Sequence, residues 1–282
     1  MTQNPTEAAI LVTGANGRLG QLLHRAWSQV LRPERRMIYL ARSAPADLIW
    51  TPDKPLDALP ACSTVIALWG VTSGTAEELA QNTALARQSL ELARACGAKR
   101  VLHFSSAAVY GPGSNMHESK EPAPVTAYGH AKLAMEAEIA GFPAEGIHHC
   151  CLRLANVVGA DSLAPALRPS PRPLSLDRFG NGDGPMRSYI APGDLARVLI
   201  AMAQLPPHAL PDTLNVTSPK PIAMAALADA AGRNIDWQDA PETAIQTVTL
   251  DGTRLERLLP GIIDFTTARW MVANWQQLEA AK

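Results

Sequence analysis

The chain has 282 residues, and 47% of them are hydrophobic, which is enough to build a full core in one large domain or two small ones. Its net charge is −1 at pH 7 and it has no lysine/arginine run, which argues against nucleic acid or an anionic membrane as a partner. No apolar stretch approaches the roughly 20 residues of a membrane span, and segment 1–9 is too polar for a signal peptide, so we expect a cytoplasmic protein.

Apolar strand-like runs alternate with helical runs along much of the chain. Strands are expected at Ile10–Val12, Met37–Leu40, Leu48–Trp50, Thr64–Leu68, Val101–Phe104 and His149–Leu154. Helices are expected between them at Leu19–Val30, Ala76–Cys96 and Ala127–Ala140. This alternation predicts an α/β fold with a doubly wound, Rossmann-like parallel sheet, in which ligands bind beyond the carboxyl ends of the strands.

The first strand stops at a glycine-rich turn, GANGRLG over 14–20, which leads directly into a helix. Gly14 would permit a tight turn, Gly17 would let a pyrophosphate approach the N–H groups at the helix start, and Gly20 would let helix and strand pack closely. The spacing differs by one residue from the G-x-G-x-x-G of ordinary dehydrogenases. The turn therefore predicts a dinucleotide site, with a purely structural turn as the alternative.

Tyr128 and Lys132 are four residues apart on a predicted helix, so their side chains share one face. A phenol is a poor base at neutral pH, but a neighbouring cation favours its ionised form, and a serine hydroxyl can hold a substrate oxygen beside it. The serine pair before this helix, at 105–106, supplies such hydroxyls. The pattern indicates a proton-transfer site; taken alone, it is also typical of surface pairs.

The tract His148-His149-Cys150-Cys151 contains four residues of types that bind zinc. Consecutive strand residues point to opposite faces of a sheet, so these four side chains cannot surround one ion. We interpret them as buried strand residues and expect no metal site. The remaining cysteines, Cys62 and Cys96, stand alone, as in a protein of a reducing compartment.

After the sixth strand the pattern is less regular. Pro165–Pro173 is expected to be a loop, and a helix is expected near Gly193–Gln204. From Ala223 the tail carries two helical stretches and three tryptophans, which indicates a small carboxy-terminal substrate domain. The expected division is a nucleotide-binding domain over 1–157 and 189–216 and a substrate-binding domain over 158–188 and 217–282.

Several motifs in the expected order carry a resemblance to a known family. They are TGANGRLG at 13–20, LWG at 68–70, Asn82, FSSAAVYG at 104–111, YGHAK at 128–132, LRLANVVG at 152–159 and RSYIAPGDLA at 187–196. From Ile10 to about Val216 the chain resembles the extended short-chain dehydrogenase/reductase superfamily, and within it the NAD(P)-dependent epimerase/dehydratase-like family.

The resemblance implies roles for individual residues. The catalytic residues would be Ser106, Tyr128 and Lys132. The cofactor would be bound by Gly14, Asn16, Gly17, Arg18, Leu19, Arg42, Leu68, Trp69, Gly70, Tyr128 and Lys132. The substrate would be bound by Ser106, Asn156 and Arg187. In this family the helix of the tyrosine and lysine often pairs with its copy, so the resemblance also implies a homodimer.

The end of the second strand bears on the choice of cofactor. An acidic residue there would bind the adenosine ribose hydroxyls, whereas an arginine would bind a 2′-phosphate. The segment YLARS at 39–43 offers Arg42 and no carboxylate, and Asp47 lies too far along the chain. We therefore favour NADP(H), with NAD possible if Arg42 is only a solvated loop residue.

Departures from the family pattern bear on the reaction. Its dehydratases carry an acidic pair directly after the hydroxyl residue, where this chain has Ala107 and Ala108, and no Cys/His acid–base pair is evident. Ser106, Tyr128 and Lys132 suffice for hydride transfer between an alcohol and a carbonyl. We favour an oxidoreductase acting on a sugar-like or small hydroxy/keto metabolite; the alternatives are an NAD-retaining (nucleotide-)sugar 4-epimerase and a non-catalytic NADPH-binding sensor.

Overall fold

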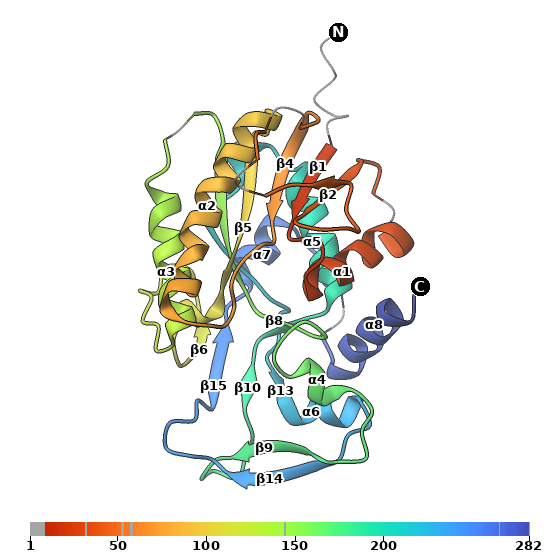
Figure 1. Ribbon diagram of the computed structural model, residues 1–282. Coiled ribbons are helices and arrows are strands. Elements are labelled where there is room, and N and C mark those ends of the chain that lie inside the picture. The colour runs from red at the N-terminus through yellow and green to blue at the C-terminus, as the bar shows by residue number, and fades with distance from the viewer. Residues whose placement is uncertain are drawn as a thin grey trace.

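The computed structural model describes residues 9–31, 33–51, 54–56, 59–143, 145–264 and 266–281, and a parallel sheet of seven strands forms its centre (Figure 1). The strand order is β12-β7-β5-β4-β1-β2-β3, and each neighbouring pair is parallel. The strands are β1 (Ala9–Thr13), β2 (Met37–Ala41), β3 (Leu48–Ile49), β4 (Cys62–Ala67), β5 (Arg100–Ser106), β7 (His148–Leu154) and β12 (Thr213–Val216). The order reverses at β1, as in a doubly wound sheet.

Helices cover both faces of this sheet, which confirms the predicted fold class. One face packs against α1 (Arg18–Arg25), the π-helical turn η1 (Ala26–Leu31), α5 (Pro192–Gln204) and α8 (Ala268–Ala280). The other face packs against α2 (Ala76–Cys96) and α3 (Ala127–Ala140). Cys150 belongs to the first of these cores and Cys151 to the second, as the predicted alternation requires.

A smaller lobe lies beyond the carboxyl ends of the strands (Figure 1). It is built around a four-stranded sheet of order β13-β10-β15-β6 and a pair of parallel strands, β14-β9. These strands are β6 (Gly113–Met116), β9 (Leu174–Arg178), β10 (Met186–Arg187), β13 (Ile222–Ala223), β14 (Ile235–Asp239) and β15 (Thr247–Leu250). Its short helices are α4 (Ala164–Leu167) and α6 (Met224–Ala230).

The remaining short elements connect the two parts. They are the 3-10 helices η2 (Ala107–Tyr110) and η3 (Pro207–Ala209), the strand pair β8 (Asn156–Val157) and β11 (Tyr189–Ile190), and α7 (Thr253–Leu258). Strand β6, which lies between Ser106 and Tyr128 in the chain, pairs with β15 of the small lobe. The predicted domain boundaries at 158, 189 and 217 stay predictions.

The helix expected over Leu19–Val30 is confirmed, as α1 to Arg25 followed by the π-helical η1. Two other details of the predicted elements were wrong. The segment expected to be a loop from Pro165 contains part of α4, because a proline fits the first turn of a helix and Leu167 is buried. The described part of the tail from Ala223 holds three helices rather than two. No helix in the described ranges is long and apolar enough to span a membrane.

Candidate active site

The glycine turn and the end of β4 meet at the carboxyl edge of the sheet. Gly14 has φ +67°, and a Cβ at this position would lie 2.8 Å from the backbone nitrogen of Trp69. Gly20 is equally restricted, because its Cβ would lie 2.5 Å from the carbonyl oxygen of Ala15. Only glycine lets these backbones approach so closely, so the turn brings β1, α1 and the end of β4 to one point.

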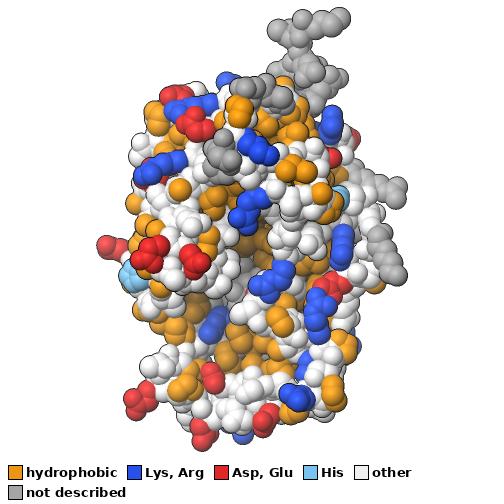
Figure 2. Space-filling model, in the orientation of Figure 1, with side chains coloured by type: hydrophobic (Ala, Val, Ile, Leu, Met, Phe, Trp, Pro, Cys, Tyr) orange, Lys and Arg blue, Asp and Glu red, His pale blue; other side chains and the backbone are white. Residues whose placement is uncertain are grey.

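The start of α1 fits an anion. Gly17 is its N-cap and contributes no side-chain cap, and its first turn contains no acidic residue. The first amides of a helix have no partner within it, and the helix dipole adds a partial positive charge. Figure 2 shows lysine and arginine side chains beside the hollow in the middle of the displayed face, which also suits an anionic ligand. The backbone at Gly17 therefore fits the pyrophosphate of a dinucleotide.

The loop after β2 is tied to this turn. Asn16 donates through Nδ2 to the carbonyl oxygen of Ser43 at 2.7 Å, which places the neighbouring Arg42 beside the turn with an exposed side chain. Arg18 is also exposed, and its Nη1 lies 3.5 Å from the carbonyl oxygen of Asp161. Two cations thus flank the proposed dinucleotide site.

The remaining predicted cofactor residues line the same edge with different degrees of burial. Leu19 and Leu68 are half-buried and pack against the core. Trp69 is fixed by a hydrogen bond from its Nε1 to Ser89 Oγ, at 2.9 Å. A Cβ on Gly70 would lie 3.1 Å from Lys132 Nζ, so the absence of a side chain there leaves room above the ammonium group.

Ser106, Tyr128 and Lys132 come together at the end of β5. Ser106 Oγ accepts a hydrogen bond from the amide of Ala108 at 3.2 Å, and the Ser106 hydroxyl acts to lower the pKa of Tyr128. Lys132 Nζ lies 5.9 Å from the centroid of the Tyr128 ring and donates to the carbonyl oxygen of Phe104 at 2.8 Å. The structure therefore brings the three residues predicted to be catalytic into one cluster.

Close packing sets the position of α3. Thr126 caps the helix by accepting from the amide of Gly129 at 3.0 Å. A Cβ on Gly129 would lie 2.5 Å from the carbonyl oxygen of Ala108, in the 3-10 turn that follows Ser106. Sequence reasoning did not single out Gly129, although a glycine next to Tyr128 in a helix was a visible signal.

Burial sets the electrostatics of the pair. Desolvation raises the pKa of Tyr128, although its hydrogen bond with Ser106 acts in the opposite direction. Desolvation lowers the pKa of Lys132 from 10.5 to about 8, and its side chain is 3% exposed. At neutral pH the site therefore holds a neutral phenol and an ammonium group that is close to releasing its proton.

Asn82 fixes the backbone beside Lys132. Its Nδ2 donates to the carbonyl oxygen of Val71 at 2.9 Å, and its Oδ1 accepts from the amide of Val71 at 3.2 Å. This pair of bonds holds the loop that contains Gly70. Because both ends of its side-chain amide are bonded, the buried Asn82 fixes the segment that follows β4.

The two residues predicted only for substrate binding lie on other elements. Asn156 is in β8, which pairs with β11, and its partner in the register is Tyr189. Arg187 is in β10, and its guanidinium donates to the carbonyl oxygens of Met186, Gln246 and Ile245 at 2.8, 2.7 and 2.6 Å. In this structure the guanidinium of Arg187 is thus bonded to the backbone of its own lobe.

The positions that follow Ser106 carry no acid. Ala107 and Ala108 open η2, directly beside the hydroxyl group of Ser106. One carboxylate that sequence reasoning missed lies deeper, at Glu136, which is one helical turn after Lys132 and 8% exposed. The i, i+4, i+8 spacing of Tyr128, Lys132 and Glu136 was a signal that could have identified it.

Comparison with known families gives one match over most of the chain. The model described as "NAD dependent epimerase/dehydratase family" matches residues 10–217. No curated relative matches the sequence.

Solved structures of similar fold cover nearly the whole chain. A short-chain dehydrogenase/reductase superfamily protein from Agrobacterium tumefaciens with bound NAD has a TM-score of 0.77 at 20% identity, over 96% of this chain and 97% of that one. MoeE5 in complex with UDP-glucose and NAD has a TM-score of 0.75 at 20% identity, over 96% and 98%. A UDP-galactose 4-epimerase has a TM-score of 0.72 at 20% identity, over 96% and 99%.

Proposed function

Because the chain belongs to the NAD dependent epimerase/dehydratase family of enzymes, we propose that it transfers a hydride between a nicotinamide cofactor and an alcohol or carbonyl group of a sugar-like or small hydroxy/keto metabolite. The cluster of Ser106, Tyr128 and Lys132 beside the glycine turn carries this proposal. These groups are the ones that hydride transfer needs from the protein: a hydroxyl to hold the substrate oxygen, a proton donor and a cation.

A nicotinamide bound at the glycine turn would supply or accept the hydride. The amides in the first turn of α1 would hold its pyrophosphate, and Lys132 would bind its ribose. Ser106 would orient the substrate oxygen, and Tyr128 would give a proton to that oxygen during reduction or remove it during oxidation. The nearby ammonium of Lys132 would stabilise the phenolate that remains after the proton has left.

The state of Tyr128 suits the reduction step. Burial raises the pKa of its phenol, so the group is protonated at neutral pH and ready to donate to a carbonyl oxygen. Ala107 and Ala108 offer no acid for a dehydration, because each side chain is a methyl group. We therefore propose a reductase, with the sensor that binds NADPH without turnover as an outcome that an activity assay would reveal.

The proposed cofactor is NADP(H). The exposed guanidinium of Arg42 lies beside the glycine turn, where a 2′-phosphate could accept a bidentate bond. Asp47, the next carboxylate along the chain, accepts a hydrogen bond from the amide of Tyr39 at 2.9 Å and so already has a partner. The solved structures of similar fold hold NAD, which keeps NAD as the alternative cofactor.

The hydrogen bonds of Arg187 bear on the class of substrate that the site would take. Three of its five N–H donors are bonded to carbonyl oxygens of its own lobe, which leaves two for a nucleotide diphosphate, so we propose a substrate without a nucleotide. The second candidate, an NAD-retaining 4-epimerase of a nucleotide sugar, is favoured by the likeness to a UDP-galactose 4-epimerase.

A homodimer and a cytoplasmic location complete the proposal. Size-exclusion chromatography with light scattering tests whether the protein is a dimer.

Bound nucleotide distinguishes the two candidates. An epimerase returns the hydride to the same substrate molecule, so NAD should copurify at about one per chain. A reductase must release its cofactor each turnover, so the protein should purify largely empty and bind added NADPH reversibly. Denaturation followed by chromatography measures the bound nucleotide, and copurified NAD would refute the reductase and promote the epimerase.

A further inference from the structure

The buried face of α3 continues beyond the two predicted catalytic residues. Tyr128, Lys132 and Glu136 follow at four-residue spacing on this face. Lys132 Nζ donates to the carbonyl oxygen of Phe104 at 2.8 Å, and Ser105 Oγ donates to Glu136 Oε1 at 2.5 Å. Two residues on one face of the helix are therefore bonded to two consecutive residues of β5.

Glu136 also forms a buried ion pair with Arg153 of β7. Arg153 Nη2 lies 2.7 Å from Glu136 Oε2, and Arg153 Nε lies 3.1 Å from Oε1. The two side chains are only 7% and 9% exposed. Desolvation of two charges offsets most of their attraction, and apolar residues of similar volume often give equal or greater stability. Stability alone is thus a weak reason for such a pair here.

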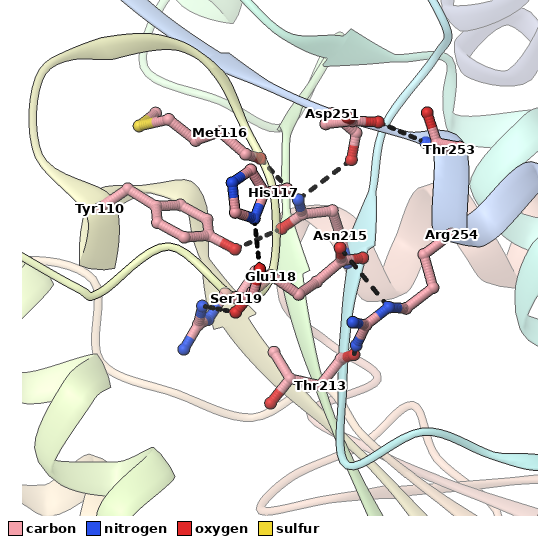
Figure 3. Close-up of polar contacts among 11 residues, drawn as sticks. Tyr110, Met116, His117, Glu118, Ser119, Thr213, Asn215, Asp251, Thr253 and Arg254 are labelled. Atoms are coloured by element: carbon pink, nitrogen blue, oxygen red, sulfur yellow. Dashed lines mark hydrogen bonds and ion pairs between the residues drawn. The ribbon is translucent and has the colours of Figure 1, made fainter.

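Arg153 is in turn held by a polar network that reaches the small lobe. Its guanidinium carbon lies 4.7 Å from the centroid of the Tyr110 ring, and its Nη1 donates to the carbonyl oxygen of Glu118 at 3.4 Å. The carboxylate of Glu118 accepts from the amide of Asn215 at 2.9 Å and lies 3.6 Å from Arg254 Nε (Figure 3). The ion pair therefore cannot shift without disturbing several elements.

Most titratable groups around Lys132 are uncharged at the pH where Lys132 loses its proton. They are Tyr128 and Glu136 on α3, His103 on β5, and Cys151 and Arg153 on β7. Burial raises the pKa of Tyr128 and Cys151 and lowers the pKa of His103, so these three are neutral near pH 8. Among the described side chains, Glu136, which is paired with Arg153, is left as the charged group that acts on Lys132.

We propose that Glu136 and Arg153 are positioning residues of the active site, which hold α3 on β5 and balance each other's charge beside Lys132. The inference rests on the proposed function only in the role given to Lys132, since the contacts themselves are observed. Without Glu136, the cation of Arg153 would act on the ammonium group unopposed. Without Arg153, the carboxylate of Glu136 would favour that ammonium.

The test follows the titration of Lys132 directly. The chain has six lysines, so ¹³Cε labelling gives few signals, and a Lys132→Arg spectrum identifies the one from Lys132. Glu136→Gln should lower the titration midpoint of Lys132 from about 8 by roughly one pH unit or more, and Arg153→Gln should raise that midpoint. The double variant Glu136→Gln/Arg153→Gln restores the charge balance and should titrate within about half a unit of the wild type.

Opposite shifts in the two single variants would distinguish this role from a merely structural one, which would lower stability without moving the midpoint in opposite directions. The other lysines provide an internal control, because their signals should not change. An unchanged midpoint in Glu136→Gln would overturn the inference, and if that variant does not fold, an unchanged midpoint in Arg153→Gln would do so. A wild type that binds no NADPH while the midpoints move would instead refute the cofactor assignment.

Discussion

Lys132→Met should reveal how much stability the buried ammonium group costs. Methionine keeps an unbranched chain of similar length and removes the charge. The pKa of Lys132 falls from its usual 10.5 to about 8 on folding, which at 1.36 kcal/mol per pH unit corresponds to about 3 kcal/mol. The side chain is only 3% exposed, so solvent screens little of this cost.

The direction in which stability changes with pH follows from proton binding. Between about pH 8 and 10.5 the unfolded chain holds the proton of Lys132 and the folded protein does not, so wild-type stability rises with pH in this window. The advantage of Lys132→Met should therefore shrink by about 2 kcal/mol between about pH 7 and about pH 9.5. Loss of the bond to Phe104 adds a penalty that does not depend on pH.

Urea unfolding of both proteins at the two pH values measures the difference, and other titrating groups cancel in the comparison. Lys99→Met is the matched control, because Lys99 is exposed and its substitution should change stability by less than about 0.5 kcal/mol at either pH. If the difference between wild type and Lys132→Met stays constant across the window, the reasoning about the buried ammonium is wrong.

Three further predictions concern the site and its packing. Tyr128→Phe should lower turnover by roughly 10² or more and leave cofactor affinity within a few-fold, which steady-state kinetics and calorimetry check. Arg42→Ala should weaken NADPH binding by roughly 10- to 100-fold and leave NADH unchanged; equal losses for both nucleotides would exclude Arg42 as the selector. Gly129→Ala should lose about 1–3 kcal/mol in urea unfolding because its Cβ meets Ala108, whereas Gly180→Ala, with open space around it, should stay within about 0.5 kcal/mol.

The elements best predicted from sequence are those whose ends carry local signals. Helix α2 runs over Ala76–Cys96 as predicted, because Thr75 and Glu78 form a capping box before it and Gly97 ends it with φ 72°. Helix α3 also has its predicted bounds, with Thr126 as N-cap. The parts that were wrong, such as α4, lack side-chain caps and form where tertiary packing buries a few apolar residues.

The residues of the candidate site also differ in whether local sequence predicts their contacts. Lys132 and Tyr128 share a face of one helix, so local spacing is enough to predict their meeting, whereas Ser106, at the end of a strand, was assigned through the family resemblance. The surroundings of Lys132 are not local, because Arg153 comes from β7 and Asn82 from α2. No spacing rule connects these elements before the fold is known.

Arg187 shows why a sequence motif alone does not identify a ligand. The resemblance implies a substrate-binding guanidinium at this place, and in the structure Arg187 lies on β10. Whether that guanidinium is free depends on the backbone of Ile245 and Gln246, nearly 60 residues further along the chain, whose carbonyl oxygens it binds. Three of the five N–H donors of Arg187 are bonded to carbonyl oxygens, so a diphosphate would have to bind through the remaining two or displace some of these bonds. The partners of this side chain, and not only its presence in the motif, therefore bear on the proposed substrate class.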